Sequence, residues 1–70
     1  MFRARMEALS PREKQVMGLV TEGMANKVIA STLDLSVKTV EKHRSSMMRK
    51  LEMQSVAGLV RNVLSVEGDI

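Results

Sequence analysis

The chain has 70 residues with a single Phe and no Trp, Tyr or Cys, so one small domain with a core of aliphatic and methionine side chains is expected. The absence of Cys excludes disulfides and thiolate sites, and one His cannot form a metal site alone, so neither a metal nor a cofactor is expected. The net charge of +3 is compatible with an anionic partner, and no apolar run approaches the roughly 20 residues that span a bilayer, which favours a cytoplasmic protein without a membrane role.

The N-terminal part of the chain contains one strong helix start. Residues 1–8 carry charged side chains without Gly or Pro, and we interpret them as a helical tail or a linker. Ser10 suits an N-cap, Pro11 suits the first helical position, and Glu13 can close a capping box three residues after the cap. The helix that begins at Pro11 is predicted to end at Gly23, because glycine favours the left-handed C-terminal cap.

The middle of the chain predicts two helices joined by a tight turn. A short helix is expected over residues 26–33, followed by Asp34 in the left-handed conformation. Ser36 caps a third predicted helix, which runs from residue 37 to 50 or 51. Five of the eleven basic residues fall in this helix, where Glu41 is the only acid; they are Lys38, Lys42, Arg44, Arg49 and Lys50. This pattern suits a helix-turn-helix that lays one helix in the major groove, although periodicity and charge alone leave a plain helical bundle equally open.

A last helix is predicted after Ser55, which serves as its N-cap. It carries a wide apolar stripe, which consists of Val56, Leu59, Val60, Val63 and Leu64. The stripe is wider than packing against three short helices requires, so part of it is expected to face a second copy of the chain. Periodicity does not divide it between core and interface; the residues predicted for the dimer interface are Ala57, Val60, Arg61 and Leu64. Residues 67–70 are predicted as a C-terminal tail.

Many residues stand at spacings that are typical of one family. They are Leu9-Ser10-Pro11-Arg12-Glu13, Val16-Met17, Gly23, Asn26-Lys27, Ile29-Ala30, Leu33-Asp34-Leu35-Ser36, Lys38-Thr39-Val40, His43-Arg44 and Lys50-Leu51. Over residues 9–66 this set closely resembles the LuxR-type helix-turn-helix family, and the run from Thr39 to Arg44 is most similar to FixJ-type response regulators. The resemblance implies an all-α four-helix bundle with a helix-turn-helix over about residues 24–43. Its third helix would read the major groove, and its fourth would support dimerisation on DNA.

Three residues depart from the family pattern. Ala25 stands where a capping Ser is frequent, Val28 where Glu is frequent, and Asp34 where Gly is frequent in the turn. None of them falls on a position that is expected to read bases. We therefore expect a less firmly held start of the second helix and no loss of function.

Base contacts are expected on the exposed side near the start of the third helix, because that end of a recognition helix enters the groove most deeply. The resemblance assigns these contacts to Glu41, Lys42 and Ser45. Lys42 can donate to guanine O6 or N7, and Glu41 can accept from the N4 amino group of cytosine. For Glu41, an ion pair with Lys38 or Arg44 on the same helix is an equally open alternative.

Phosphate contacts fix the register of a protein on DNA without reading its sequence. The candidates are Asn26, Lys27, Ser36, Lys38, Thr39, Arg44 and Lys50. Lys27 and Lys38 stand near helix N-termini, which also favour phosphate oxygens. For Ser36 the alternative is a capping role alone, and for Lys50 it is a surface cation that is favoured near a helix C-terminus.

We therefore predict sequence-specific binding to double-stranded DNA in bacterial transcription regulation, by the effector domain of a two-component response regulator that forms a homodimer on DNA. RNA polymerase and an N-terminal receiver domain absent from this chain are further expected partners. The alternatives are a sigma-factor-like promoter-recognition domain and a helical dimerisation module without DNA binding. An enzyme is not expected, since the sequence has no Gly-rich phosphate loop, no metal-ligand spacing and no nucleophile with an associated base.

Overall fold

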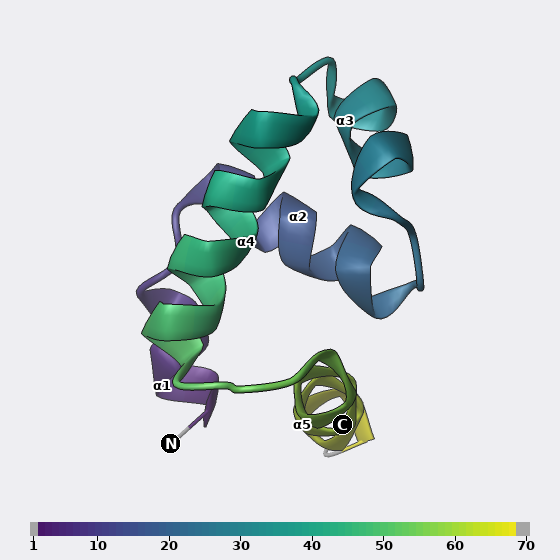
Figure 1. The fold of residues 1–70 in the computed structure, drawn as a ribbon. Coiled ribbons are helices and arrows are strands. Elements are labelled where there is room, and N and C mark those ends of the chain that lie inside the picture. Colours follow the sequence, from purple (N-terminus) through teal and green to yellow (C-terminus); the bar gives the residue numbers. More distant parts are fainter. Residues whose placement is uncertain (1, 69–70) are drawn as a thin grey trace.

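The computed structural model describes residues 2–68, which fold into five helices without a strand among them (Figure 1). The helices are α1 (Phe2–Glu7), α2 (Pro11–Thr21), α3 (Asn26–Leu33), α4 (Val37–Leu51) and α5 (Val56–Gly68). The predicted all-α class is confirmed, and α2 to α5 are the four predicted helices. No helix within residues 2–68 is both long and apolar enough to traverse a lipid bilayer.

The first and last segments of the described residues are both helical. The segment interpreted as a helical tail or a linker forms α1, which packs against α4. Phe2 and Met6 are one helical turn apart and both pack against the core, which explains why this segment is helical. At the other end, α5 continues to Gly68, beyond the predicted boundary at residue 66. The rest of the predicted tail, residues 69–70, lies outside the described residues.

The start of α2 has the predicted capping box. The Ser10 hydroxyl accepts a hydrogen bond from Glu13 N at 3.1 Å, and Glu13 Oε1 accepts one from Ser10 N at 2.8 Å. Pro11 occupies the first turn, where its missing N–H removes no helical hydrogen bond. The segment after α2 also follows the prediction, because Gly23 has φ 88°, a backbone conformation that suits glycine best.

The turn between α3 and α4 is formed as the sequence predicted. Asp34 is left-handed, with φ 57° and ψ 47°. Ser36 caps α4, since its hydroxyl accepts a hydrogen bond from Thr39 N at 3.1 Å. The start of α3 is different, because Ala25 is its N-cap and provides no side-chain hydrogen bond there. The helix-turn-helix therefore has one well-capped helix, α4, and one helix that needs support from elsewhere.

Helix α4 is the central element of the fold. Helices α1, α2 and α3 pack against it, and α5 packs against α2 (Figure 1). The largest fully buried side chains come from α2 to α5; they are Val16, Ile29, Val40, Met47, Leu51 and Leu59. Three of these six belong to α4, so one side of α4 is fixed in the core. Its opposite side is available to solvent or to a ligand.

The apolar stripe of α5 divides into a core side and an exposed side. Leu59 is fully buried, and Val63 packs against the core. Val56 and Leu64 are exposed, with 60% of Leu64 accessible to solvent, and Val60 is half-buried. The structure thus shows which residues of the stripe belong to the core and which are exposed, a question that periodicity left open.

Candidate nucleic-acid interface

The outer side of α4 brings together the three residues predicted to read bases. Glu41, Lys42 and Ser45 are all exposed, and they lie on one side of the helix because positions three and four apart are neighbours. They line a shallow groove together with three residues at the start of α4, which are Ser36, Lys38 and Thr39. The groove therefore lies at the N-terminal half of the helix, where a recognition helix enters DNA.

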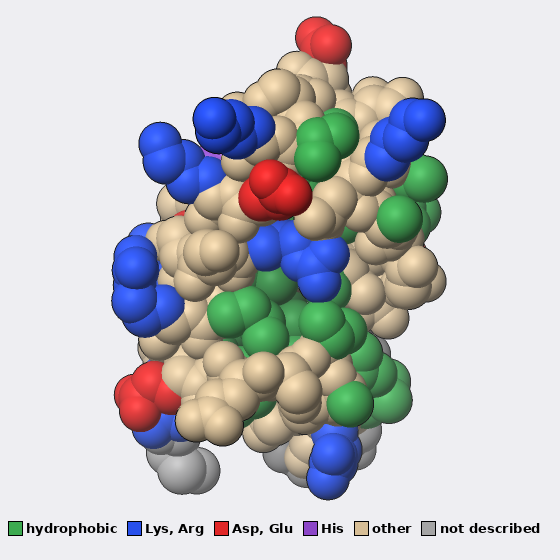
Figure 2. All heavy atoms as spheres, viewed as in Figure 1, with side chains coloured by type: hydrophobic (Ala, Val, Ile, Leu, Met, Phe, Trp, Pro, Cys, Tyr) green, Lys and Arg blue, Asp and Glu red, His purple; other side chains and the backbone are tan. Residues whose placement is uncertain are grey.

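Basic side chains follow the edge of the molecule along which α4 runs. Figure 2 shows Lys and Arg side chains along this edge, with acidic side chains at few points between them. The first turn of α4 contains no acidic residue, so nothing in that turn offsets the partial positive charge of the helix N-terminus. The surface is suited to an anionic partner.

The Glu41 carboxylate is free of the intrahelical ion pair that the sequence left open. In the part of the chain that the structure describes, neither Lys38 nor Arg44 comes within 4.0 Å of it. Glu41 is also exposed. Its oxygen atoms are available to accept hydrogen bonds from a partner.

Asn26 and Arg44, both predicted to contact phosphates, contact each other. The Arg44 guanidinium of α4 donates a hydrogen bond to Asn26 Oδ1 at the start of α3, and both side chains are half-buried. This bond holds the end of α3 that lacks a capping side chain. No local pattern indicates the pairing, because the two residues are 18 positions apart.

The remaining phosphate candidates near the helix starts fall into two groups. Lys27 and Lys38 are exposed, and the ion pairs within residues 2–68 do not involve them. Ser36 and Thr39 hydrogen-bond each other, since Ser36 Oγ donates to Thr39 Oγ1 at 2.8 Å and accepts from Thr39 N. The capping role expected for Ser36 is therefore present.

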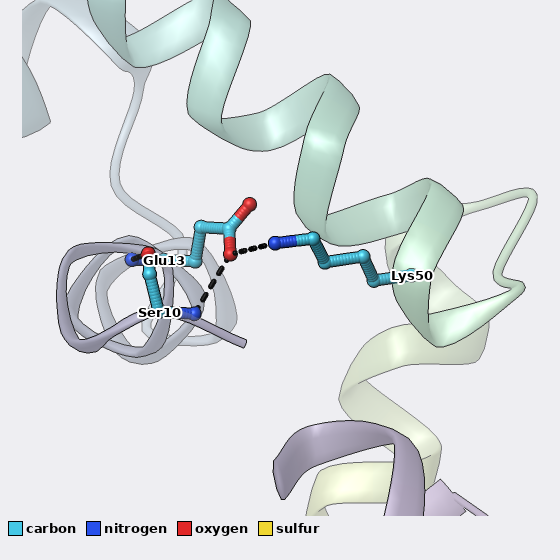
Figure 3. A network of polar contacts seen from close by, with 3 residues as sticks. All are labelled: Ser10, Glu13 and Lys50. Carbon is cyan, nitrogen blue, oxygen red and sulfur yellow. Dashed lines mark hydrogen bonds and ion pairs between the residues drawn. The ribbon is translucent and has the colours of Figure 1, made fainter. Parts of the chain in front are cut away.

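Lys50 lies in a different environment from the one that the sequence suggested. Its ammonium Nζ donates to Glu13 Oε1 of α2 at 2.8 Å (Figure 3). Only 3% of Glu13 is exposed, so the ion pair has one buried partner. This contact gives Lys50 a structural role within the domain, and the phosphate contact expected from the sequence stays a prediction. The two residues are 37 positions apart, and no spacing in the sequence points to their contact.

The surroundings of Glu13 stabilise its ionised form. Hydrogen bonds from Lys50, Ser46 and the Ser10 backbone lower the pKa of Glu13 from its ordinary 4.5 to about 2, although burial acts in the opposite direction. The carboxylate thus joins the α2 cap to the C-terminal half of α4. It fixes the end of α4 that lies away from the groove.

The residues predicted for a dimer interface lie on the outer side of α5. Ala57, Arg61 and Leu64 are exposed, and Val60 is half-buried beside them. Leu64 and Val60 are one helical turn apart, so the surface includes an apolar strip next to one cation. We define Ala57, Val60, Arg61 and Leu64 as the α5 outer face.

Comparison with known proteins identifies the family. Residues 7–63 match the family model described as "Bacterial regulatory proteins, luxR family". The chain belongs to the LuxR family. The resemblance seen in the sequence is thereby confirmed. Membership in this family means that the domain binds DNA in transcription regulation. It excludes the two alternatives that the sequence left open, a sigma-factor-like promoter-recognition domain and a helical dimerisation module without DNA binding.

The matched relatives of this LuxR-family domain include response regulators. The chain is 48% identical over 64 residues to the transcriptional regulatory protein FixJ of Rhizobium meliloti strain 1021, a match that covers 91% of this chain and 31% of that protein. It is 47% identical over 60 residues to the response regulator protein TodT of Pseudomonas putida strain F1, covering 86% and 26%. The chain thus spans less than a third of the length of these relatives.

Two solved structures have the same fold. The response regulator StyR superposes with a TM-score of 0.88 at 38% identity, over 91% of this chain and 32% of that one. Full-length FixJ from B. japonicum gives a TM-score of 0.79 at 43% identity, over 86% and 30%. The expected similarity to FixJ-type response regulators is therefore confirmed in sequence and in structure.

Proposed function

We propose that α4 of this LuxR-family domain lies in the major groove, where Glu41, Lys42 and Ser45 contact base edges. The observation that carries this proposal is the outer side of α4, whose polar side chains are exposed and line one groove while its other side is fixed in the core. Lys42 would donate to guanine, and Glu41, which has no ion-pair partner on its helix, would accept from cytosine.

The phosphate contacts follow from which polar groups remain available. Lys27 and Lys38 are exposed at the starts of α3 and α4, and we assign them direct contacts to phosphates. Ser36 is hydrogen-bonded to Thr39, and Arg44 is hydrogen-bonded to Asn26. We assign these two pairs supporting contacts to phosphates. Lys50 is left out of the set, since its ammonium group is held by Glu13.

We further propose that the domain acts as a homodimer on DNA through the α5 outer face. A two-fold dimer would place two α4 helices about one DNA turn apart, so the half-sites would be centred roughly 10 base pairs from each other. The exposed Leu64 and half-buried Val60 supply the apolar surface that such contacts use. The small size of the domain favours pairing on DNA over firm pairing in solution, because stable interfaces usually bury upwards of ~1,200 Å².

The relatives suggest the larger setting of this domain. FixJ and TodT are longer proteins named as regulators, and the chain corresponds to less than a third of each. We propose that the domain is the effector part of a two-component response regulator, controlled by a receiver domain that precedes it. Its partners would then include RNA polymerase as well as the chromosome, which places its action in the cytoplasm.

Selection of bound sites from random-sequence DNA tests the proposed function. The 70-residue chain should enrich a two-fold symmetric sequence with two half-sites. Lys42→Ala should enrich a changed sequence, whereas Lys14→Ala, which alters an exposed lysine on α2, should enrich the parent sequence. Recovery of unenriched random DNA by the parent chain would contradict sequence-specific binding.

A further inference from the structure

One exposed apolar side chain stands at the start of α4, next to the residues that line the groove. Val37 is the first residue of this helix, and 41% of it is exposed. Among the residues with described side chains, the large exposed hydrophobic residues are Val28, Val37, Val56 and Leu64. Val28 lies on α3 and the other two on α5, so Val37 is the member of this group that belongs to α4.

The position of Val37 places it beside the residues proposed to read bases. It follows the Ser36 cap and precedes Lys38, and both of these neighbours line the groove. Glu41 is four positions further along, which puts the two side chains on adjacent turns of the same side of the helix. If α4 lies in the major groove, Val37 stands at the N-terminal end of the helix, which enters the groove most deeply.

The chemistry of the major groove offers one apolar group to such a side chain. Base edges present nitrogen and oxygen donors and acceptors, together with the C5 methyl group of thymine. Glu41, Lys42 and Ser45 match the polar groups. Val37 has no hydrogen-bonding side-chain atom and no acidic charge that would complement the helix N-terminus. Its two methyl groups match the thymine methyl.

We propose that Val37 packs against the C5 methyl group of a thymine in the binding site and so sets a thymine preference at one position of each half-site. The inference rests on the proposed function, since it requires α4 in the major groove. It adds an apolar contact to the polar base contacts assigned above. The contact removes the thymine methyl group and the Val37 methyl group that touches it from water, and this burial is the origin of the stabilisation.

Deoxyuridine gives a direct test, because it lacks only the C5 methyl group of thymidine. After a half-site is selected with the parent chain, each thymidine in it is replaced in turn by deoxyuridine, and the dissociation constants are measured for the parent and for Val37→Ser. At one position the replacement should weaken the parent about fourfold, the factor expected for losing the burial of one methyl-sized group. Val37→Ser should show almost no change at that position.

A matched variant separates this contact from general effects. Val28→Ser alters a valine on α3 that is 50% exposed, and it should keep the fourfold loss on deoxyuridine that the parent shows. Helical circular dichroism should match the parent in both variants. Equal deoxyuridine losses for the parent and Val37→Ser at every position would overturn the role of Val37 while leaving DNA binding intact. Failure of the parent to bind any selected DNA would overturn this inference together with the proposed function.

Discussion

Lys50, close to the end of α4, donates to Glu13 in the first turn of α2, with 2.8 Å between Nζ and Oε1. The same carboxylate oxygen accepts from Ser10 N, so one buried group serves both the helix cap and the contact between helices. An ion that is buried in this way depends on its partner, because removal of the partner leaves an uncompensated charge. The pair therefore fixes α4 against α2 at the end of α4 away from the groove.

Replacement of Lys50 by Ala should lower the free energy of unfolding by about 1 to 3 kcal/mol, because the buried Glu13 carboxylate loses its cation. Urea unfolding followed by circular dichroism measures this quantity. Lys14→Ala removes an exposed lysine from α2 and should change stability by less than about 0.5 kcal/mol. Equal stability losses for the two variants would contradict the structural role of the ion pair.

Acid should destabilise the domain through the titration of Glu13. The pKa of this group is about 2 in the folded domain, below its ordinary value of 4.5, so the unfolded chain binds the proton more readily. The stabilisation is therefore fully present above pH 4.5 and is lost as the pH falls from there toward 2. Glu13→Gln should unfold with a weaker pH dependence than the parent over this interval. The same pH dependence in both proteins would show that Glu13 is not the group responsible.

The sequence predicted the features that depend on near neighbours. The Ser10 and Glu13 capping box, the left-handed Asp34 and the Ser36 cap each depend on residues within a few positions, and each is present in the structure. The stripe of α5 was also recognised from its spacing. These features could be predicted from the sequence because capping hydrogen bonds and backbone preferences at turns act locally.

Contacts between residues that are far apart in the sequence could not be predicted in the same way. The pairs Lys50–Glu13 and Arg44–Asn26 join residues that are 37 and 18 positions apart. The side chains of Lys50, Arg44 and Asn26 suit solvent or DNA equally well until the packing of α2, α3 and α4 is known. The sequence therefore predicted the outer side of α4 as the binding surface but gave no sign of the contact between Lys50 and Glu13.

Arg44 and Asn26 should be energetically coupled. Single replacements by Ala at either position remove the same hydrogen bond between α4 and α3, so the double variant should lose less stability than the sum of the two. A coupling energy of about 0.5 to 1.5 kcal/mol is expected from unfolding free energies in a double-mutant cycle. Additive losses would show that the bond contributes nothing to the stability of the helix-turn-helix.

Lys42 and Lys38 should have different effects on DNA binding. Lys42→Ala should reduce discrimination at one base pair by roughly 1 to 3 kcal/mol, because it removes a base contact. Lys38→Ala should weaken binding to all sequences alike, because it removes a phosphate contact. Dissociation constants on the selected site and on random DNA separate the two roles. If Lys42→Ala loses equal affinity on both DNAs, its assignment as a base reader is wrong.

A charge placed on the α5 outer face should prevent pairing on DNA. Ala57→Glu puts a carboxylate on an exposed position next to this apolar strip, so it should abolish cooperative binding to a probe with two half-sites. Helical circular dichroism and affinity for a single half-site should stay close to those of a control, Gln54→Glu, which adds the same charge at an exposed position before α5. Cooperativity equal to that of the control would place the dimer contact elsewhere.

The salt dependence of DNA affinity tests the central claim most directly. Each phosphate that Lys or Arg neutralises releases counterions, so log K should fall linearly with log salt concentration with a slope of about −0.9 per contact. The parent chain should show a slope that corresponds to several phosphates, and the double variant Lys27→Ala/Lys38→Ala should show a slope smaller in magnitude by about 1.8. An affinity for DNA that stays constant from low to physiological salt would contradict the assignment of α4 and the start of α3 as a DNA-binding surface.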